Sequence, residues 1–140
     1  MKKNLKIKDK LRSSGLRPTK QRVQIAEFLF EREKTFHFTV ENLDKLVNSK
    51  TTGRKISLAT FYNTVHAFTR AGHLKEILTN NNKSYFDTHI GPHYHFFDEK
   101  NNELTDIDSK EIKLKNIPNA PKGKTIKDID VVINIENDSQ

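Results

Sequence analysis

Residues 57–72 read Ser-Leu-Ala-Thr-Phe-Tyr-Asn-Thr-Val-His-Ala-Phe-Thr-Arg-Ala-Gly, and the rest of the chain is interpreted outward from them. Ser57 is a residue type that caps helix N-termini, and Gly72 can adopt the left-handed conformation in which many helices end. Between them apolar residues recur every three or four positions, which predicts an amphipathic helix. Its expected buried face consists of Leu58, Phe61, Val65 and Phe68.

The opposite face of this helix is polar. It carries Thr60, Tyr62, Asn63, His66 and Arg70. Side chains of this kind form defined hydrogen bonds with base edges in the major groove of DNA. The alternative is a surface helix whose polar face is simply solvated.

Composition limits the size and class of the protein. The chain has 140 residues, 34% of them hydrophobic and 31% charged, which predicts one or two small domains with a modest core. It has no cysteine, so disulfides and thiolate metal sites, including a four-cysteine structural zinc, are excluded. We find no long apolar run and no secretory signal, and therefore expect a cytoplasmic protein without a membrane partner.

Charge is distributed unevenly along the chain. Residues 1–86 hold 18 Lys and Arg against 7 Asp and Glu, whereas residues 87–140 hold 7 against 11. A basic first part favours a polyanion partner, and nucleic acid is favoured over a membrane surface because no basic amphipathic helix with exposed aromatics is present. We therefore expect double-stranded DNA to bind residues 1–86.

A basic cluster lies at the start of another predicted helix, which begins near residue 20. Pro18 disfavours helical geometry before it, and Thr19 can cap a helix that continues through Val23, Ala26 and Phe30. The cluster, which is suited to phosphate contacts at a helix start, consists of Arg17, Lys20 and Arg22. The alternative is ordinary surface charge.

The remaining pattern of residues 1–86 completes a winged helix-turn-helix. Thr39 caps another predicted helix, residues 48–56 form a polar loop, and residues 74–86 alternate as a hairpin expected to form a two-stranded wing. In this motif the second helix of the pair enters the major groove. The expected fold class is α+β, with an N-terminal winged helix-turn-helix domain and a small C-terminal α/β dimerisation domain.

Residues 87–140 predict three strands, at 93–98, 103–107 and 129–135, and one or two helical turns after Ala120. A sheet of this size buries too little apolar surface to be stable alone. A homodimer would supply the missing contacts and present two helices to DNA with two-fold symmetry.

Histidine and aspartate residues predict a metal site. His93 and His95 lie two positions apart on a predicted strand and therefore share a face, and Asp87 and His37 could complete a set of nitrogen and oxygen ligands. Such a set suits zinc, ferrous iron or manganese, and the His93–His95 pair could instead ligate haem. The alternative is a partly buried surface pair without a ligand.

Several motifs in order resemble the ferric uptake regulator superfamily, and within it the iron response regulator (Irr) branch. The resemblance covers roughly residues 11–135. The motifs are residues 15–22, residues 57–64 with Ala71-Gly72, Tyr85-Phe86-Asp87, His93-Tyr94-His95, and later Asn116-Ile117-Pro118 with Pro121, Gly123 and Asp130-Val131-Val132.

This resemblance implies a homodimeric DNA-binding transcriptional regulator of iron and haem metabolism, not an enzyme. It implies that Tyr62 contacts bases, Arg17 approaches the minor groove, and haem is sensed through His93 and His95. It also implies an interdomain metal site whose ligands are His37, Asp87, His93 and His95. Ser57, Thr60 and Asn63 are expected beside Tyr62 on the DNA, with Asn63 favouring adenine and thus an A·T-rich inverted repeat.

The chain departs from the family in places. Asp98 and Asn101 stand where many members carry zinc-binding cysteines, and Tyr94 replaces the middle histidine of a triplet common in the branch. A second family metal site, which would need ligands at Pro92 and Tyr94, is therefore not expected. Rival hypotheses are a regulator that senses ferrous or manganous ion directly, a nonspecific nucleic-acid packaging module, and a small histidine-dependent metalloenzyme.

Overall fold

The computed structural model describes residues 2–139, which pack as two compact units, each described separately below. The first unit ends at Ile90 and the second begins at Gly91. The division falls beyond residue 86 because Asp87 is paired with His37 and Lys75 in a sheet of the first unit.

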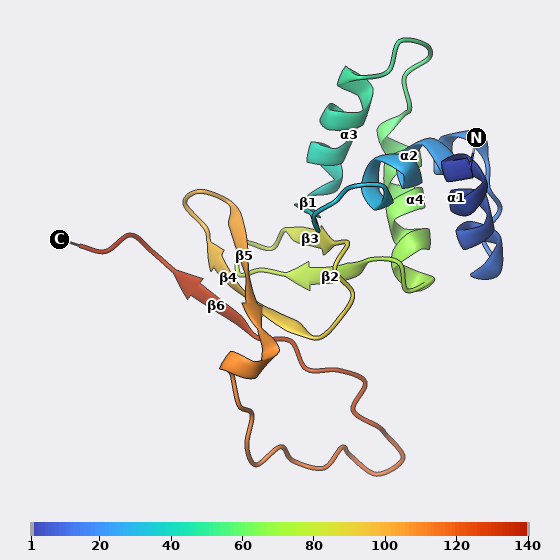
Figure 1. Ribbon diagram of the computed structural model, residues 1–140. Helices are drawn as coiled ribbons and strands as arrows, with labels where there is room; N and C mark the ends of the chain where they lie inside the picture. Colours follow the sequence, from blue (N-terminus) through green and yellow to red (C-terminus); the bar gives the residue numbers. More distant parts are fainter. Residues whose placement is uncertain (1, 140) are drawn as a thin grey trace. The chain divides into compact units, whose positions relative to one another are not determined.

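The first unit contains four helices among its described residues, and Figure 1 shows them stacked around α4. Their bounds are α1 Lys2–Ser13, α2 Lys20–Phe30, α3 Val40–Ser49 and α4 Leu58–Arg70. The expected caps are confirmed, because the side chains of Thr19, Thr39 and Ser57 each accept a hydrogen bond from the backbone amide three residues later. None of the helices within residues 2–139 is long and apolar enough to cross a bilayer.

Helix α4 forms the centre of the first hydrophobic core. Phe61, Val65 and Phe68 are completely buried, as expected, against Leu11 and Val23 among others. Leu58 was expected on the same face but is 41% exposed, and Thr64 is buried. Leu58 is the first residue of the helix, which explains why it lies at the margin of the core.

The end of α4 follows the expected chemistry. Gly72 has φ +86°, and the amides of Gly72 and His73 donate to the carbonyls of Thr69 and Phe68 at 3.1 and 2.9 Å. These two bonds form a Schellman motif, which satisfies carbonyls that the helix leaves without a partner. Helix α4 therefore ends at Gly72, because a glycine occupies the position of this motif that requires a positive φ.

The wing has three strands rather than two. The strands β1 His37–Phe38, β2 Lys75–Leu78 and β3 Ser84–Asp87 form an antiparallel sheet in the order β1-β3-β2. The sequence predicted the β2–β3 hairpin, but the link before α3 also adds a short strand. This addition places His37 directly opposite Asp87.

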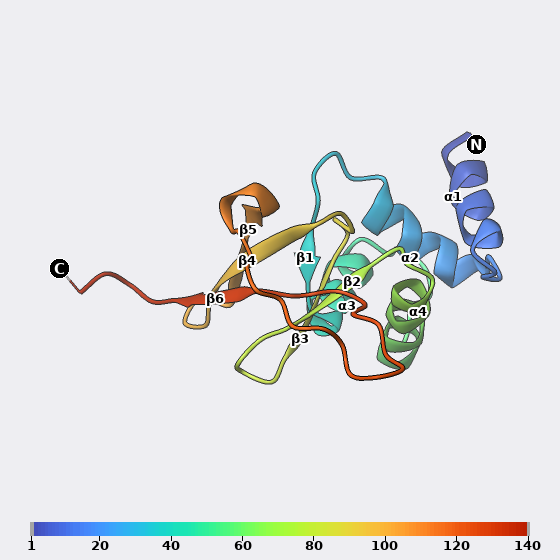
Figure 2. The ribbon, with the colours of Figure 1, turned by 90° about the horizontal axis from the view of Figure 1, so that it is seen from below.

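The second unit is a β-sheet with a long connection. Strands β4 His93–Asp98 and β5 Glu103–Asp108 are antiparallel, a short 3₁₀ turn covers Ser109–Glu111, and β6 Val132–Ile135 pairs in parallel with β4. Residues 112–131 run outside helices and strands, as Figure 2 shows in orange and red. The helical turns expected after Ala120 are absent from this described segment, so the described residues of this domain form a β-sheet with one 3₁₀ turn.

Candidate DNA-binding surface and metal ligands

The exposed side of α4 carries the residues expected to read DNA. Tyr62 is 37% exposed, and Asn63 and His66 are exposed as well. Ser57 and Thr60 lie at the start of the helix, where their hydroxyls are 2.9 Å apart and the Thr60 amide donates to Ser57 Oγ at 3.2 Å. The structure therefore gives Ser57 and Thr60 a helix-capping role besides any contact with DNA.

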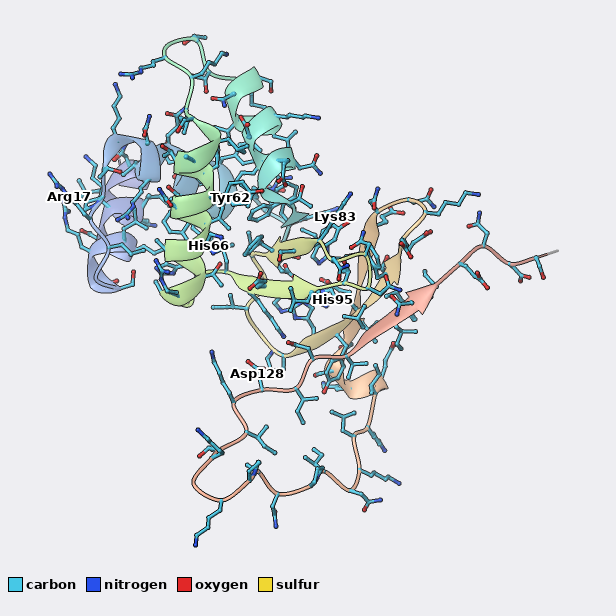
Figure 3. The ribbon with its side chains drawn as sticks, turned by 180° about the vertical axis from the view of Figure 1, so that it is seen from behind. Arg17, Tyr62, His66, Lys83, His95 and Asp128 are labelled. Atoms are coloured by element: carbon cyan, nitrogen blue, oxygen red, sulfur yellow. The ribbon has the colours of Figure 1, made fainter. Side chains whose placement is uncertain are left out.

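Tyr62 belongs to a small network that the sequence did not predict. Its hydroxyl donates a short hydrogen bond to the Glu41 carboxylate on α3, and its ring stacks on His66 with centroids 6.3 Å apart. His66 in turn meets the Phe86 ring edge-on at 6.2 Å. Figure 3 shows Tyr62 and His66 on α4 and Lys83 on the turn between β2 and β3.

This network determines which hydrogen-bonding groups Tyr62 could present to a base. The bond to Glu41 raises the pKa of the Tyr62 phenol, and the same bond is the main reason the pKa of Glu41 is lowered. The phenolic proton therefore points to Glu41, so to any further partner Tyr62 would present its oxygen as an acceptor and its ring as an apolar surface. An acceptor matches the amino groups of adenine and cytosine, and an apolar ring matches the thymine methyl group.

The basic cluster before α2 is only partly available to a partner. Arg17 and Lys20 are exposed, whereas Arg22 is half-buried and its guanidinium donates to the Arg17 carbonyl at 3.3 Å. Arg22 therefore holds the turn that carries Arg17, which is labelled in Figure 3. Arg17 and Lys20 are the better placed of the three for phosphate contacts.

Two of the predicted metal ligands lie together in the first unit. His37 Nε2 is 3.1 Å from Asp87 Oδ2, across the β1–β3 pair. Asp87 is fully buried, and its other oxygen accepts a hydrogen bond from the His89 amide at 2.8 Å. Carboxylate oxygen and imidazole nitrogen are both ligand types that bind zinc in proteins.

The second unit holds the other two predicted ligands and a further candidate, Asp106, that was not expected from the sequence. His93 and His95 are buried, 4% and 3% exposed, and their Nε2 atoms lie 3.7 and 3.3 Å from Asp106 Oδ1 on β5. His93 Nδ1 donates to the Gly91 carbonyl at 2.7 Å, which leaves its Nε2 as the atom able to bind a metal. The ligand atoms of these three residues lie within 4.8 Å of one another.

These separations suit a metal ion. Two ligand atoms at about 2.1 Å from one ion, at angles between 90° and 110°, are about 3.0–3.4 Å apart. The His37–Asp87 and His95–Asp106 distances lie in this range, and the His93–Asp106 distance is slightly above it. Imidazole nitrogen and carboxylate oxygen are ligands for zinc, ferrous iron and manganese.

The family model described as the ferric uptake regulator family matches residues 13–135. The chain is 32% identical over 97 residues to the peroxide-responsive repressor PerR of Staphylococcus epidermidis and 31% identical over 97 residues to the peroxide operon regulator of Bacillus subtilis. These alignments cover 69% of this chain but only 62% and 64% of the relatives, so the chain spans less than two thirds of their length.

Solved structures show the same fold. The ferric uptake regulator from Pseudomonas aeruginosa with manganese matches with a TM-score of 0.69 at 23% identity, over 92% of this chain and 96% of that one. A zinc-bound manganese uptake regulator matches with a TM-score of 0.64 at 24% identity, over 91% and 96%. The expected α+β fold, a helical N-terminal domain followed by a small C-terminal domain, is confirmed by these matches.

The expected branch within the superfamily is not supported. The relatives above are named a peroxide-responsive repressor and a peroxide operon regulator. Nothing in these matches points to the iron response regulator branch or to haem.

Proposed function

Because the chain belongs to the ferric uptake regulator family, we propose that it is a dimeric, metal-responsive transcriptional regulator that binds DNA through α4. The family consists of transcriptional regulators, so the chain is not an enzyme. The observation that supports the proposal best is the coexistence of an exposed polar face on α4 with two groups of candidate metal ligands, in which Asp87, His93 and His95 are buried. The small metalloenzyme hypothesis is thereby set aside.

We infer that one ion is held by both groups of ligands together. Asp87 and His93 are joined by residues 88–92 alone, and a link of that length, which spans at most about 20 Å, would allow both groups to bind the same ion. The ligand set would then comprise three imidazoles and two carboxylates, from His37, Asp87, His93, His95 and Asp106. Five donors exceed the four of a typical structural zinc site, which favours ferrous or manganous ion.

The ion would act by restricting how the DNA-binding unit is held relative to the second unit. It can shift this equilibrium only by binding one arrangement more tightly than the other. In a dimer this sets the separation of the two α4 helices, which must match half-sites about one helical turn of DNA apart. We propose the functional division expected from the sequence, with residues 1–86 for DNA binding, including the β2–β3 wing, and residues 87–140 for dimerisation and metal sensing. The compact units themselves divide after Ile90, so Asp87 packs with the first unit.

Dimerisation is supported by the thin core of the second unit. Phe97, Leu104 and Ile107 are its buried apolar side chains, whereas Ile133 and Ile135 on the edge strand β6 are 39% and 43% exposed. Further exposed apolar residues lie along the connection before β6, namely Leu114, Ile117, Ile126 and Ile129. Covering this surface with a second copy would supply the burial that a domain of about fifty residues lacks.

A response to hydrogen peroxide is the second candidate, favoured by the similarity to two peroxide-responsive regulators. The chain has no cysteine, so thiol oxidation cannot carry such a response. Oxidation would have to act on the residues that hold the ion. Haem, expected from the sequence at His93 and His95, is retained as a comparison in the test below.

The test is selection of bound DNA from a random pool by the full chain. Metal-free protein is compared with protein loaded with manganous, anaerobic ferrous or zinc ion, and with protein given haem. We expect an inverted repeat to be enriched with manganous or ferrous ion, and enrichment to be lost in Tyr62→Ala and in His95→Ala. Equal enrichment with and without metal would reject the metal response, and loss of binding on adding haem would favour haem sensing instead.

A second experiment tests the response to peroxide and uses protein loaded with ferrous ion. Release of the selected DNA after brief peroxide treatment, with manganous protein unaffected, would support the second candidate. Unchanged DNA binding in both samples would reject it.

A further inference from the structure

A basic hollow lies between the start of α2 and the loop that joins α3 to α4. It encloses about 530 Å³ and is lined by three cations, Lys20, Lys50 and Arg54, together with amide and hydroxyl side chains. The residues that line it, all in the described part of the chain, include no Asp or Glu. A concave surface with cations and no carboxylate attracts anions.

The loop that forms one wall is held in a defined shape by hydrogen bonds. The Asn48 side chain donates to the Ile56 carbonyl at 2.9 Å and accepts from the Ile56 amide at 3.0 Å. Lys55 Nζ donates to the carbonyls of Asn48 and Thr51 at 2.6 and 2.8 Å. Gln24 on α2 donates to Thr51 Oγ1 at 3.1 Å, which ties the loop to the opposite wall.

This arrangement separates a structural cation from those that line the hollow. Lys55 caps the carbonyls at the end of α3, whereas Lys50 and Arg54 have exposed side chains. The Lys50 ammonium lies 5.3 Å from the centre of the Phe28 ring, a contact that orients the charge without neutralising it. The hollow is therefore preorganised for an anion before any ligand arrives.

We propose that this hollow binds backbone phosphates of the DNA that α4 reads, with Lys50 and Arg54 as contacts in addition to Lys20. The inference rests on the proposed function and extends it to residues that no motif indicated. Its location supports it, because the loop leads directly into Ser57 and α4, and α2 begins at Lys20 beside Arg17. Phosphodiester groups on either side of the groove entered by α4 would meet this part of the unit.

The experiment measures binding of the full-length dimer to its selected DNA and to random DNA over a range of salt concentrations. The variants are Lys50→Gln, Arg54→Gln and the double variant, and Lys50→Arg tests rescue. Each phosphate contact contributes roughly 0.9 to the slope of log affinity against log salt. Losing one should therefore weaken binding about fivefold at 0.15 M salt, equally on both DNAs.

The matched control is the double variant Lys113→Gln and Lys122→Gln, which removes the same charge from exposed positions of the second unit. It should leave the salt slope nearly unchanged, and thermal unfolding should show that all variants remain folded. A salt slope in Lys50→Gln with Arg54→Gln equal to that of the control would overturn the inference. So would a loss confined to the selected DNA, because that would assign these residues to base reading.

Other ligands of the same chemistry give distinct results. A pocket for free phosphate would show as stabilisation of the wild type by inorganic phosphate, at fixed ionic strength, with no effect of the variants on DNA binding, and this would refute the proposal. A wild-type chain that retains no DNA at all would refute the proposed function and this inference together. Selection of DNA by a wild type whose variants behave like the control would refute the inference alone.

Discussion

Metal binding should raise the free energy of unfolding, and the structure indicates which side chains this gain depends on. We compare wild type with Asp106→Ala on β5, with His37→Ala on β1, and with Glu103→Gln as a control on the same strand as Asp106. Asp106 lies 3.3 Å from His95, whereas Glu103 is exposed and pairs with Asp98 at the far end of the hairpin. The first two changes should remove metal-dependent stability, and the control should not.

The expected size follows from linkage. An ion present at one hundred times its dissociation constant stabilises the folded state by about 2.7 kcal/mol. With an unfolding entropy of about 2.1 cal/mol/K per residue, a chain of 140 residues should gain about 9 °C in melting temperature. If loss of one ligand weakens affinity a hundredfold, the gain at the same metal concentration falls to about 0.4 kcal/mol, or roughly 1–2 °C.

The assay is thermal unfolding with and without manganous ion, read as the difference between the two for each variant. The difference removes any direct cost of the substitution, such as leaving the buried Asp87 carboxylate without His37. A shift retained in His37→Ala but lost in Asp106→Ala would mean that the second unit binds the ion alone, and the shared site would be wrong. A full shift in both variants would refute the assignment of all these ligands.

Three further predictions concern the first unit. Glu41→Gln should lower the pKa of the Tyr62 phenol toward its ordinary value, because the hydrogen bond to the Glu41 carboxylate raises that pKa. Titration of the tyrosinate absorbance should show this change, with Tyr62→Phe used to assign the signal. An unchanged titration would contradict the hydrogen bond. Ser57→Ala should destabilise the unit by about 1 kcal/mol through loss of the α4 cap, whereas Ser57→Asn should restore most of it in denaturant unfolding. Burial, and to a smaller extent the charge of Lys10, lowers the pKa of His73. The stabilisation that the neutral His73 imidazole provides is therefore present above about pH 6.5 and is lost as the pH falls below that value. His73→Gln should therefore reduce the decrease in unfolding free energy between pH 7.5 and 5.5. An identical pH dependence in wild type and variant would argue against this role of His73.

Local signals in the sequence predicted most of the first unit. Ser57, Thr39 and Gly72 act through their own backbone neighbourhoods, so their roles can be recognised without knowledge of the fold. Leu58 was placed wrongly because helical periodicity cannot tell the first turn, where the core ends, from the later ones. The short strand His37–Phe38 was missed as part of the wing because its partner, β3, lies far along the chain.

The additional candidate ligand, Asp106, could have been found from the register of the predicted hairpin. The sequence predicted strands at 93–98 and 103–107 around a turn at 99–102, and that turn sets Asp98 opposite Glu103. The same register sets His95 opposite Asp106, so the carboxylate was implied by the hairpin. Glu41, by contrast, meets Tyr62 through the packing of α3 against α4, which no local pattern specifies.

The parallel pairing of β6 has a consequence for how the second unit opens. The His95 amide donates to the Val131 carbonyl at 3.2 Å, so the backbone of a predicted ligand is held by a strand that follows the long segment 112–131. Ordering such a segment costs chain entropy, and detaching β6 recovers it while leaving the β4–β5 hairpin paired. In hydrogen exchange the β4 amides that point to β6 should lose protection before those that point to β5. An ion bound to His95 would slow this loss of protection. The exchange rates of the β4 amides that point to β6 would therefore report whether the metal site is occupied.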